Sequence, residues 1–219
     1  MTLSATSGPA RLAPIPPGDV DSILSGARDG RPWAADYPSE GDTHVARELA
    51  SGRWRLPTDD EPWGPWQVVD ASSGLVVGGA GLHGPPDADG TVEIGYGIVE
   101  SFRGRGIATD AVARVCALAT SHGAHRVIAE TDADNAASQR TLQRNGFLER
   151  DGDATSIWWS LDVDLLRGLA EVTAHGQPAH ADAAGRLAQA LRGPGATVDL
   201  EAAAVSLVDA VRNDPYLSR

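Results

Sequence analysis

The chain has 219 residues, with 18 basic against 30 acidic side chains and a formal net charge of −12. All 18 basic residues are Arg, and a chain without Lys cannot be a Schiff-base enzyme, a Walker A phosphate-loop protein or a kinase with a catalytic lysine. The acidic balance also argues against nucleic acid as the main partner, because phosphate contacts need a basic face.

The hydrophobic fraction of 42% predicts a globular chain with one domain and an appendage, or two small domains. A single Cys cannot form an internal disulfide and gives no zinc cluster. The N-terminus lacks a basic and apolar signal segment, and no run of about 18 apolar residues is present. We therefore expect a soluble cytoplasmic protein without a membrane partner or a metal site.

The first elements expected along the chain are a leader, a helix and an antiparallel meander. Residues 1–10 are small and polar and predict a flexible leader. Residues 42–49 predict a helix, and the two prolines within residues 58–66 predict a loop. Apolar runs bounded by turns rich in Gly, Pro and Asp predict three strands, over residues 66–69, 75–82 and 91–99.

The apolar pattern then changes to the helical period. Residues 108–122 predict a helix that Gly123 ends, and residues 126–131 predict a β-branched strand. Three further elements follow, a helix over residues 135–145 and strands over residues 147–150 and 155–161. We therefore expect a mixed α/β domain over residues 11–161, with a mostly antiparallel central sheet flanked by helices.

The remaining residues, 162–219, predict a C-terminal helical extension. Its helices are expected over residues 162–174, 181–191 and 200–211, and the last has Asp199 as N-cap and a clear apolar stripe. We expect this extension to pack on the domain or on a second copy of the chain in a homodimer. The alternative is a separate regulatory or partner-binding module.

The loop before the helix of residues 108–122 has the residues of an anion site. Gly104 and Gly106 allow positive φ, so successive N–H groups can converge on one point. The helix that follows adds its positive N-terminal end. Small Ala108 permits close approach, and Arg103 and Arg105 supply charge. The loop therefore predicts a pyrophosphate cradle built from backbone, with a glycine-rich turn that binds nothing as the alternative.

A Rossmann dinucleotide site requires a third Gly where this chain has Thr109, and a strand within a βαβ unit rather than a meander. The loop instead resembles the signature of the GNAT N-acetyltransferase superfamily, Arg/Gln-x-x-Gly-x-Gly/Ala, through Arg103, Gly106 and Ala108. Three further segments resemble the branch of the Rim-type ribosomal-protein acetyltransferases. They are the strand at residues 93–98, Asn135-x-x-Ser138 and Arg144-Asn145-Gly146-Phe147.

The resemblance implies acetyl-coenzyme A (acetyl-CoA) as co-substrate, bound in a cleft where the fourth and fifth strands diverge. Its pantetheine arm would pair with the backbone of Ile98 and Val99, and Asn135 and Ser138 match positions that touch this arm. Asn135 also suits a helix N-cap, with Ser138 at N3. The pyrophosphate would lie on the amides of Arg105, Gly106, Ile107, Ala108 and Thr109.

Two candidates for a general base lie on or beside the strand of residues 91–99. Glu93 shares one strand face with Gly95 and Gly97, and this face has little bulk, as a substrate slot requires. The alternative for Glu93 is an exposed strand carboxylate. His83, at the end of the preceding strand, is the second candidate base, with an ordinary loop residue as its alternative.

The general acid is less defined. Many family members have a Tyr in the helix after Asn135, where this chain has Thr141-Leu142-Gln143. This departure leaves Ser138, a water molecule or no dedicated acid. The sole Cys116 falls in the middle of a predicted helix and is expected to be buried, which favours direct transfer over an acyl-cysteine route.

The expected function is an acetyl-CoA-dependent N-acetyltransferase acting on a primary amine, either a peptide N-terminus or a small molecule. The alternative is a catalytically weak acyl-CoA-binding protein that acts through its helical tail. The net charge favours a cationic acceptor. The N-terminal region supplies four tryptophans, Trp33, Trp54, Trp63 and Trp66; we expect core or loop packing for most of them, and one or two lining the acceptor pocket. The candidate acidic neighbours of the amine are Asp36, Asp59, Asp60 and Glu61, with solvated loop residues as the alternative.

Overall fold

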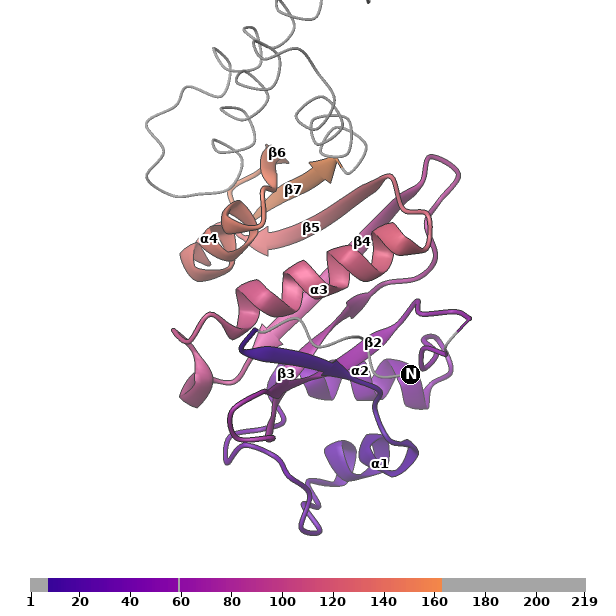
Figure 1. Cartoon of the computed structure of the whole chain (residues 1–219), viewed down its shortest axis with the longest axis vertical. Helices are drawn as coiled ribbons and strands as arrows, with labels where there is room; N and C mark the ends of the chain where they lie inside the picture. The colour runs from indigo at the N-terminus through magenta and orange to yellow at the C-terminus, as the bar shows by residue number, and fades with distance from the viewer. Residues whose placement is uncertain (1–7, 59, 163–219) are drawn as a thin grey trace, which may run out of the picture. The chain divides into compact units, whose positions relative to one another are not determined.

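The computed structural model of the chain describes residues 8–58 and 60–162 (Figure 1). The chain divides into two compact units, Met1–Glu130 and Thr131–Arg219, and each is described by itself. The three helices expected after residue 161 lie outside the described residues, apart from residue 162 itself. The expected leader is described only from Gly8, and its last residue, Ala10, is the first residue of a strand.

Five strands form the sheet of the first unit, in the spatial order β1-β2-β3-β4-β5. They are β1 (Ala10–Ala13), β2 (Pro65–Asp70), β3 (Val76–Leu82), β4 (Thr91–Ile98) and β5 (Arg126–Asp132), and the end of β5 belongs to the second unit. Pairing is antiparallel from β1 to β4 and parallel between β4 and β5. The β3–β4 register has no shift, so the alternation predicted for β4 is preserved along its length.

Helices cover both faces of this sheet. α3 (Ile107–Ser121) packs against β1, β3 and β4, whereas α1 (Pro17–Ser25) packs against α2 (Glu40–Ala50) and α2 packs against β3. Figure 1 shows α3 in front of the strands and α2 behind them. α2 begins with a capping box, in which the Ser39 side chain accepts the Asp42 N–H and the Asp42 carboxylate accepts the Ser39 N–H.

The core of the first unit lies between α3 and the sheet. β4 contributes alternate buried residues, Val92, Ile94 and Ile98. α3 contributes the apolar stripe that its sequence predicts, Ala111, Val112, Val115, Leu118 and Ala119, all of them buried. This packing fixes the start of α3, and with it the glycine loop, relative to the end of β4.

Within its described residues, 131–162, the second unit contains α4 (Ala136–Arg144) and the antiparallel hairpin of β6 (Leu148–Gly152) and β7 (Ser156–Asp162). Asn135 caps α4 by accepting the Ser138 N–H at 3.1 Å. Trp159 is buried and its Nε1 donates to Thr131 Oγ1 at 3.0 Å, whereas Trp158 is partly exposed. The two neighbouring tryptophans therefore have different environments, as the strand alternation predicts.

These elements confirm the predicted fold class, a mixed α/β fold with mostly antiparallel strands and flanking helices. The boundaries of the predicted elements agree to within two residues. β1 and α1 were not delimited, because β1 has only four residues and α1 begins within a stretch rich in Pro and Gly.

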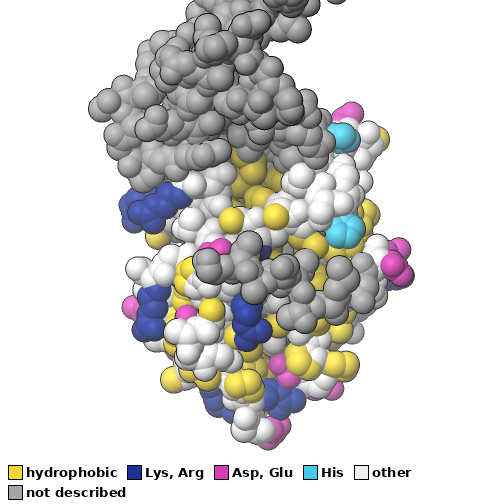
Figure 2. Space-filling model, viewed as in Figure 1, with side chains coloured by type: hydrophobic (Ala, Val, Ile, Leu, Met, Phe, Trp, Pro, Cys, Tyr) yellow, Lys and Arg dark blue, Asp and Glu magenta, His cyan; other side chains and the backbone are white. Residues whose placement is uncertain are grey.

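Two further observations concern the surface. Within residues 8–58 and 60–162, no helix combines the length and the apolar character that crossing a bilayer requires. Figure 2 shows arginine and acidic side chains dispersed among neutral ones over the face that it views. The described part of that face therefore presents no continuous basic area.

Candidate active site

The loop between β4 and α3 has the backbone conformation that its glycines predict. A short 3-10 turn, η1 (Glu100–Phe102), follows β4, and Gly104 and Gly106 then adopt φ values of 75° and 77°. Gly106 is the N-cap residue of α3, and Asp110 N donates to its carbonyl at 3.1 Å. Side chains with a Cβ are disfavoured at these φ values, so this turn requires glycine at both positions.

Consecutive backbone N–H groups in this loop lack protein acceptors. Among the described residues, no recorded hydrogen bond uses the amides of residues 104–108. These amides lead into the N-terminus of a 15-residue helix, whose dipole adds positive potential. Arg103 through Gly106 are exposed. Such an array of amides at a helix N-terminus is suited to binding a phosphate group.

The two arginines of the loop each support its backbone. Arg103 Nε donates to the Ile98 carbonyl at 3.1 Å. Arg105 donates to the Ser101 carbonyl at 2.9 Å, and its guanidinium carbon lies 4.4 Å from the ring centroid of Phe102. Because a guanidinium has five N–H donors, both side chains retain donors for an anion beside the loop.

Asp36 anchors the loop from a distant part of the sequence. Its Oδ2 accepts the Ser101 N–H at 2.9 Å, and its Oδ1 accepts the Ser101 O–H at 2.6 Å. These hydrogen bonds lower the pKa of the Asp36 carboxyl, and the charge of Arg103 adds a smaller effect. Asp36 was expected near the acceptor, and the structure shows that its carboxylate holds the turn before the glycine loop instead.

Pairing between β4 and β5 ends early. The recorded pairs begin at Thr91↔Arg126 and end at Glu93↔Ile128, and within the described residues no pair follows along β4. β4 continues to Ile98, so most of its length presents an edge that β5 does not hydrogen-bond. The two strands therefore diverge on the side where the resemblance implies a donor cleft.

The backbone of Val99 does not have the role that the resemblance implies. Its N–H donates to the Val77 carbonyl at 2.9 Å, and its carbonyl accepts the Phe102 N–H at 3.1 Å. Backbone groups of successive strand residues alternate between the two neighbouring strands. The β4 residues that direct their backbone groups toward β5 are therefore Ile94, Tyr96 and Ile98, and Val99 directs its groups toward β3.

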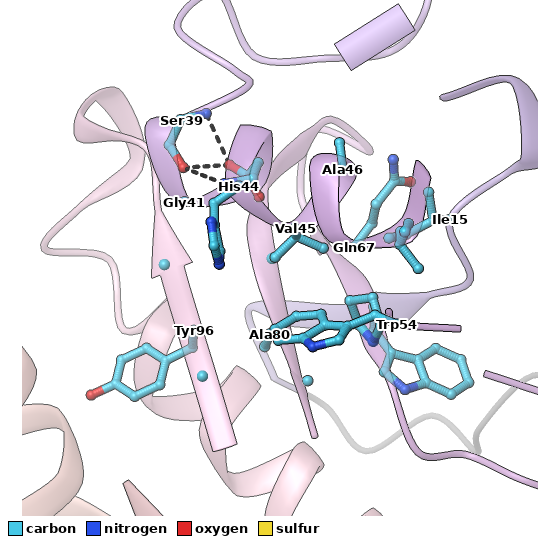
Figure 3. Close-up of a pocket in the computed structure, with 18 of the residues that line it drawn as sticks. Ile15, Ser39, Gly41, His44, Val45, Ala46, Trp54, Gln67, Ala80 and Tyr96 are labelled. Carbon is cyan, nitrogen blue, oxygen red and sulfur yellow. Dashed lines mark hydrogen bonds between the residues drawn. The ribbon is translucent and has the colours of Figure 1, made fainter. Parts of the chain in front are cut away.

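A cavity of about 280 Å³ lies on the other face of the sheet, between β2–β4 and the helices α1 and α2 (Figure 3). Its walls are mainly apolar, with Val20 and Ile23 from α1, Val45 and Leu49 from α2, and the rings of Trp54 and Trp66. Two of the four N-terminal tryptophans, Trp54 and Trp66, therefore line a cavity, and their contact with an acceptor stays a prediction. Trp33, by contrast, is buried in the core.

Glycines form the floor of this cavity. Gly79 and Gly81 of β3 are in register with Gly97 and Gly95 of β4, and all four line the cavity. A Cβ on Gly97 would meet no atom within 4 Å, so the space above it is open. Figure 3 shows the side chain of Tyr96 pointing away from the other labelled residues, as the alternation along β4 requires. The predicted slot of little bulk on the Gly95–Gly97 face is therefore present.

Asp42 lies at one end of the floor. Its Oδ2 accepts the Ser39 N–H at 2.9 Å, and an ideal Cβ on Gly79 would lie 2.9 Å from its Oδ1. Only 9% of this residue is exposed, and burial raises the pKa of the Asp42 carboxyl. Burial, and then the charge of Asp42, raise the pKa of the neighbouring Tyr37 hydroxyl, which therefore stays protonated.

His83 lies at the other end, and the structure brings it to Glu93. Nδ1 of His83 is 3.1 Å from Oε1 of Glu93, and both side chains are about one third exposed, at 35% and 33%. The His83 ring lies 5.1 Å from the Trp54 ring. Its Nε2 lies over the floor, 2.8 Å from the position of an ideal Cβ on Gly95. His83 lines the cavity, and Glu93 holds the imidazole from behind.

Sequence reasoning missed Asp42. Its position in a Ser-x-x-Asp capping box explains it as a helix-start residue, and so conceals its place in the lining of the cavity. A signal was present, because Asp42 lies on the same helical face as Val45 and Leu49, where a carboxylate is out of place. Asp60 and Glu61, which were expected near the acceptor, do not line the cavity. Asp59 lies outside the described residues.

The other predicted site residues lie in the second unit. Asn135 and Ser138 have the helix-capping relationship expected of them, and Ser138 lies in the first turn of α4. Their contacts with a pantetheine arm stay predictions.

Two observations bear on the type of chemistry. Cys116 is buried within α3, as predicted, and burial raises the pKa of its thiol to about 12. Within the parts of the chain that the structure describes, no three His, Cys, Asp or Glu side chains are grouped to hold a metal ion.

Comparison with known proteins identifies the family of the chain. Residues 10–148 match the family described as acetyltransferase (GNAT) domain. A 95-residue segment, 43% of the chain, is 33% identical to the uncharacterized N-acetyltransferase YjdG of Bacillus subtilis (strain 168), and it spans 56% of that relative, little more than half its length. A solved structure of a probable acetyltransferase matches with a TM-score of 0.53 and 22% identity, over 75% of this chain and 98% of that one. The solved structure of the ribosomal-protein-S5-alanine acetyltransferase from Vibrio fischeri matches with a TM-score of 0.50 and 17% identity, over 74% of this chain and 97% of that one.

At these identities the solved structures establish the fold alone. The family match extends over more than half of the chain and includes the glycine loop, the diverging edge of β4 and the lining of the cavity. The chain belongs to the GNAT family of acetyltransferases.

Proposed function

We propose that the protein is an acetyl-CoA-dependent N-acetyltransferase that transfers the acetyl group directly to a primary amine. The observation that carries this proposal is the continuity of two features, the unpaired amides of residues 104–108 and the edge of β4 that diverges from β5. Acetyl-CoA has a pyrophosphate followed by an arm with amide groups. These two parts follow each other in the same order as the loop amides and the open edge of β4. The phosphates meet the amides and the arm follows the strand.

The donor site follows from this arrangement. The pyrophosphate lies on the amides of residues 105–109, beside Arg103 and Arg105. The pantetheine amides pair with the β4 backbone at Ile98 and at the residues that share its direction, Tyr96 and Ile94. Asn135 and Ser138 contribute contacts to the arm on the strength of the family resemblance.

The acceptor amine enters the glycine-floored cavity from the other face of β4. His83 is the proton acceptor, because its Nε2 faces the floor at Gly95 while its Nδ1 is directed to Glu93. Glu93 is a positioning residue. Its carboxylate holds the tautomer with hydrogen on Nδ1 and stabilises the imidazolium that forms when Nε2 takes a proton.

The acetyl group passes directly from the sulfur of coenzyme A to the nitrogen of the acceptor. The acceptor ammonium gives one proton to His83, and the amine nitrogen attacks the thioester carbonyl to form a carbon–nitrogen bond. Backbone N–H groups on the open edge of β4 stabilise the oxyanion. The carbon–sulfur bond then breaks, the nitrogen gives its second proton to Ser138 or to a water molecule, and the coenzyme A thiolate takes up a proton from that group in return. His83 afterwards releases its proton to solvent. Cys116 takes no part because its thiol is buried and protonated.

Within the family we place the chain beside the Rim-type branch, with a peptide N-terminus or a small molecule as acceptor. The support is the set of motifs at residues 93–98, 135–138 and 144–147. The proposed acetyltransferase domain covers residues 11–161, and the helical extension expected after it lies outside the described residues, apart from residue 162.

Release of free thiol tests the proposal. Purified protein is titrated with acetyl-CoA by calorimetry, and thiol release is then followed with and without a panel of N-terminal peptides, diamines and aminoglycosides. We expect binding of acetyl-CoA and release of thiol that depends on an acceptor. Binding without such release for any amine would overturn the proposed activity.

A further inference from the structure

The two ends of the cavity differ in chemistry, and this difference bears on the acceptor. Among the described residues that line the cavity, Asp42 has the only carboxyl side chain, and no Arg is present. Gln67 lies at the same end, because it is in register with Gly79, over which Asp42 lies. His83 lies at the opposite end. A second imidazole, His44 of α2, also lines the cavity. The cavity therefore has one carboxylate, over Gly79, and His83 at the opposite end, with mainly apolar walls between them.

The distance between the two ends follows from the strand register. Oδ1 of Asp42 lies over Gly79, and Nε2 of His83 lies over Gly95, whose cross-strand partner is Gly81. Two residues along a strand span about 7 Å and neighbouring strands lie about 4.8 Å apart, so the two atoms are separated by roughly 8 Å. The floor between them is glycine, and the space above Gly97 is open.

One oxygen of Asp42 is available to a ligand. Ser39 directs its backbone N–H and its hydroxyl to Oδ2, and no hydrogen bond from another described residue reaches Oδ1. A carboxylate oxygen without a protein donor is stabilised most by a charged donor such as an ammonium group. A second carboxylate placed there would instead be repelled.

We propose that the acceptor is a primary amine on a short alkyl chain with a second cationic group at its far end. The far ammonium donates to Asp42 Oδ1, the methylenes pack against Val45, Leu49 and Trp54, and the near amine reaches His83. This inference rests on the proposed acetyltransferase activity and specifies its acceptor. The cavity volume of about 280 Å³ suits a small acceptor, since it is at the lower limit of ligand pockets.

Three acceptors of equal chain length test the far group. They are n-butylamine, diaminobutane and aminobutanoate, whose far ends are a methyl, an ammonium and a carboxylate. We expect kcat/KM, measured by thiol release, to be about tenfold or more higher for diaminobutane than for n-butylamine, the scale of one charge-assisted hydrogen bond. Aminobutanoate should be poorer than n-butylamine. Equal values for the three acceptors would overturn the inference.

Variants of α2 assign the effect to Asp42. Asp42→Asn should reduce the preference for diaminobutane to within about threefold, because a neutral amide forms a weaker hydrogen bond with an ammonium. Glu40→Gln is the matched control, since it removes one charge from an exposed residue of the same helical turn. This control should keep the full preference. A preference that survives Asp42→Asn would also overturn the inference.

Asp42→Asn also changes a side chain of the capping box, so a second variant is needed that keeps a carboxylate there. Asp42→Glu keeps a carboxylate at a position where Glu is a favoured capping-box residue. The longer side chain moves the charge toward His83, so the best substrate should change from diaminobutane to diaminopropane. An unchanged chain-length preference in a folded Asp42→Glu variant would contradict the assignment.

The two measurements distinguish the acceptor preference from the acetyltransferase activity. Acceptor-dependent thiol release without a preference for diamines overturns the acceptor inference alone. Binding of acetyl-CoA with no thiol release from any amine overturns the proposed activity itself.

Discussion

Nδ1 of His83 lies 3.1 Å from Oε1 of Glu93, and the backbone N–H of His83 donates to the backbone carbonyl of Glu93 at 2.9 Å. The two residues are cross-strand neighbours at the ends of β3 and β4, so the sheet itself sets the distance between their side chains. Because Glu93 occupies Nδ1, the lone pair of a neutral His83 is on Nε2, over Gly95. The two candidate bases thus form one unit.

A double-mutant cycle tests this unit. His83→Gln should lower kcat/KM about 100-fold, because an amide cannot take the proton, and Glu93→Gln should lower it about 10-fold. The double variant should be no worse than His83→Gln alone, since Glu93 acts through the imidazole. The measurement is thiol release with saturating acetyl-CoA.

The pH profile of the same variants distinguishes catalysis from packing. Both losses should shrink as the pH rises, because the acceptor amine then loses its proton to solvent without a base. A loss that is equal at every pH, or losses that multiply in the double variant, would count against the pair.

The glycine loop provides the second prediction. Gly106→Val places a β-branched residue at a φ of 77°, which costs about 1–3 kcal/mol and distorts the amide array. A domain with a typical stability of about 5–15 kcal/mol should stay folded. We expect acetyl-CoA binding, measured by calorimetry, to be lost while the circular dichroism spectrum is retained.

Gly74→Val is the matched control for this strain. Gly74 lies in the turn between β2 and β3 and has a φ of 73°. An ideal Cβ on Gly74 would meet no atom within 4 Å, and one on Gly106 would meet only Pro9 Cγ, at 3.9 Å. The control should lose a similar amount of stability and keep its affinity for acetyl-CoA. Retained affinity in a folded Gly106→Val variant would exclude the loop as the phosphate site.

The third prediction concerns Asp36, which holds Ser101 through both carboxylate oxygens. Asp36→Ala should raise the Kd for acetyl-CoA several-fold, because the turn before the glycine loop loses its anchor. Asp21→Ala, an exposed carboxylate on α1, is the control for the change in charge and should leave the Kd unchanged. An unaltered Kd in the Asp36 variant would show that the loop keeps its shape without this anchor.

The lowered pKa of Asp36 also sets a pH dependence. A carboxyl whose pKa is lower in the folded state stabilises that state above its ordinary value of 3.8, and the contribution is lost as the pH falls through the lower, folded value. The difference in Tm between wild type and Asp36→Ala should therefore be present at neutral pH and vanish in strong acid. A difference that grows on acidification would contradict the assignment.

The fourth prediction concerns Cys116, whose buried thiol has a pKa of about 12. Cys116→Ala should keep kcat, because direct transfer needs no acyl-cysteine, and should cost about 1 kcal/mol of stability, a typical effect of one substitution. Iodoacetamide should label Cys116 in urea but not in the native protein at pH near 8. Loss of turnover in a folded Cys116→Ala variant would favour a covalent route.

Several features of the candidate site were predictable because they depend on neighbours in the sequence. The glycines at 104 and 106 signal positive φ, the apolar stripe of α3 signals its buried face, and alternation along β4 identifies Glu93 and the glycine face. Each of these signals extends over only a few residues. The structure confirms the positive φ values of the loop, the buried apolar stripe of α3 and the open space above the glycine face of β4.

What the sequence by itself determined is therefore the local geometry of the loop, the strand faces and the family signature. Only the tertiary structure decided what surrounds the glycine floor. It brings Asp42 from α2 over Gly79, Trp54 against His83, and Asp36 to Ser101, contacts between residues 29 to 65 positions apart in the chain. It also turns the backbone of Val99 toward β3. The physical reason is that such contacts are set by how helices and strands pack on one another, and local periodicity carries no information about that packing.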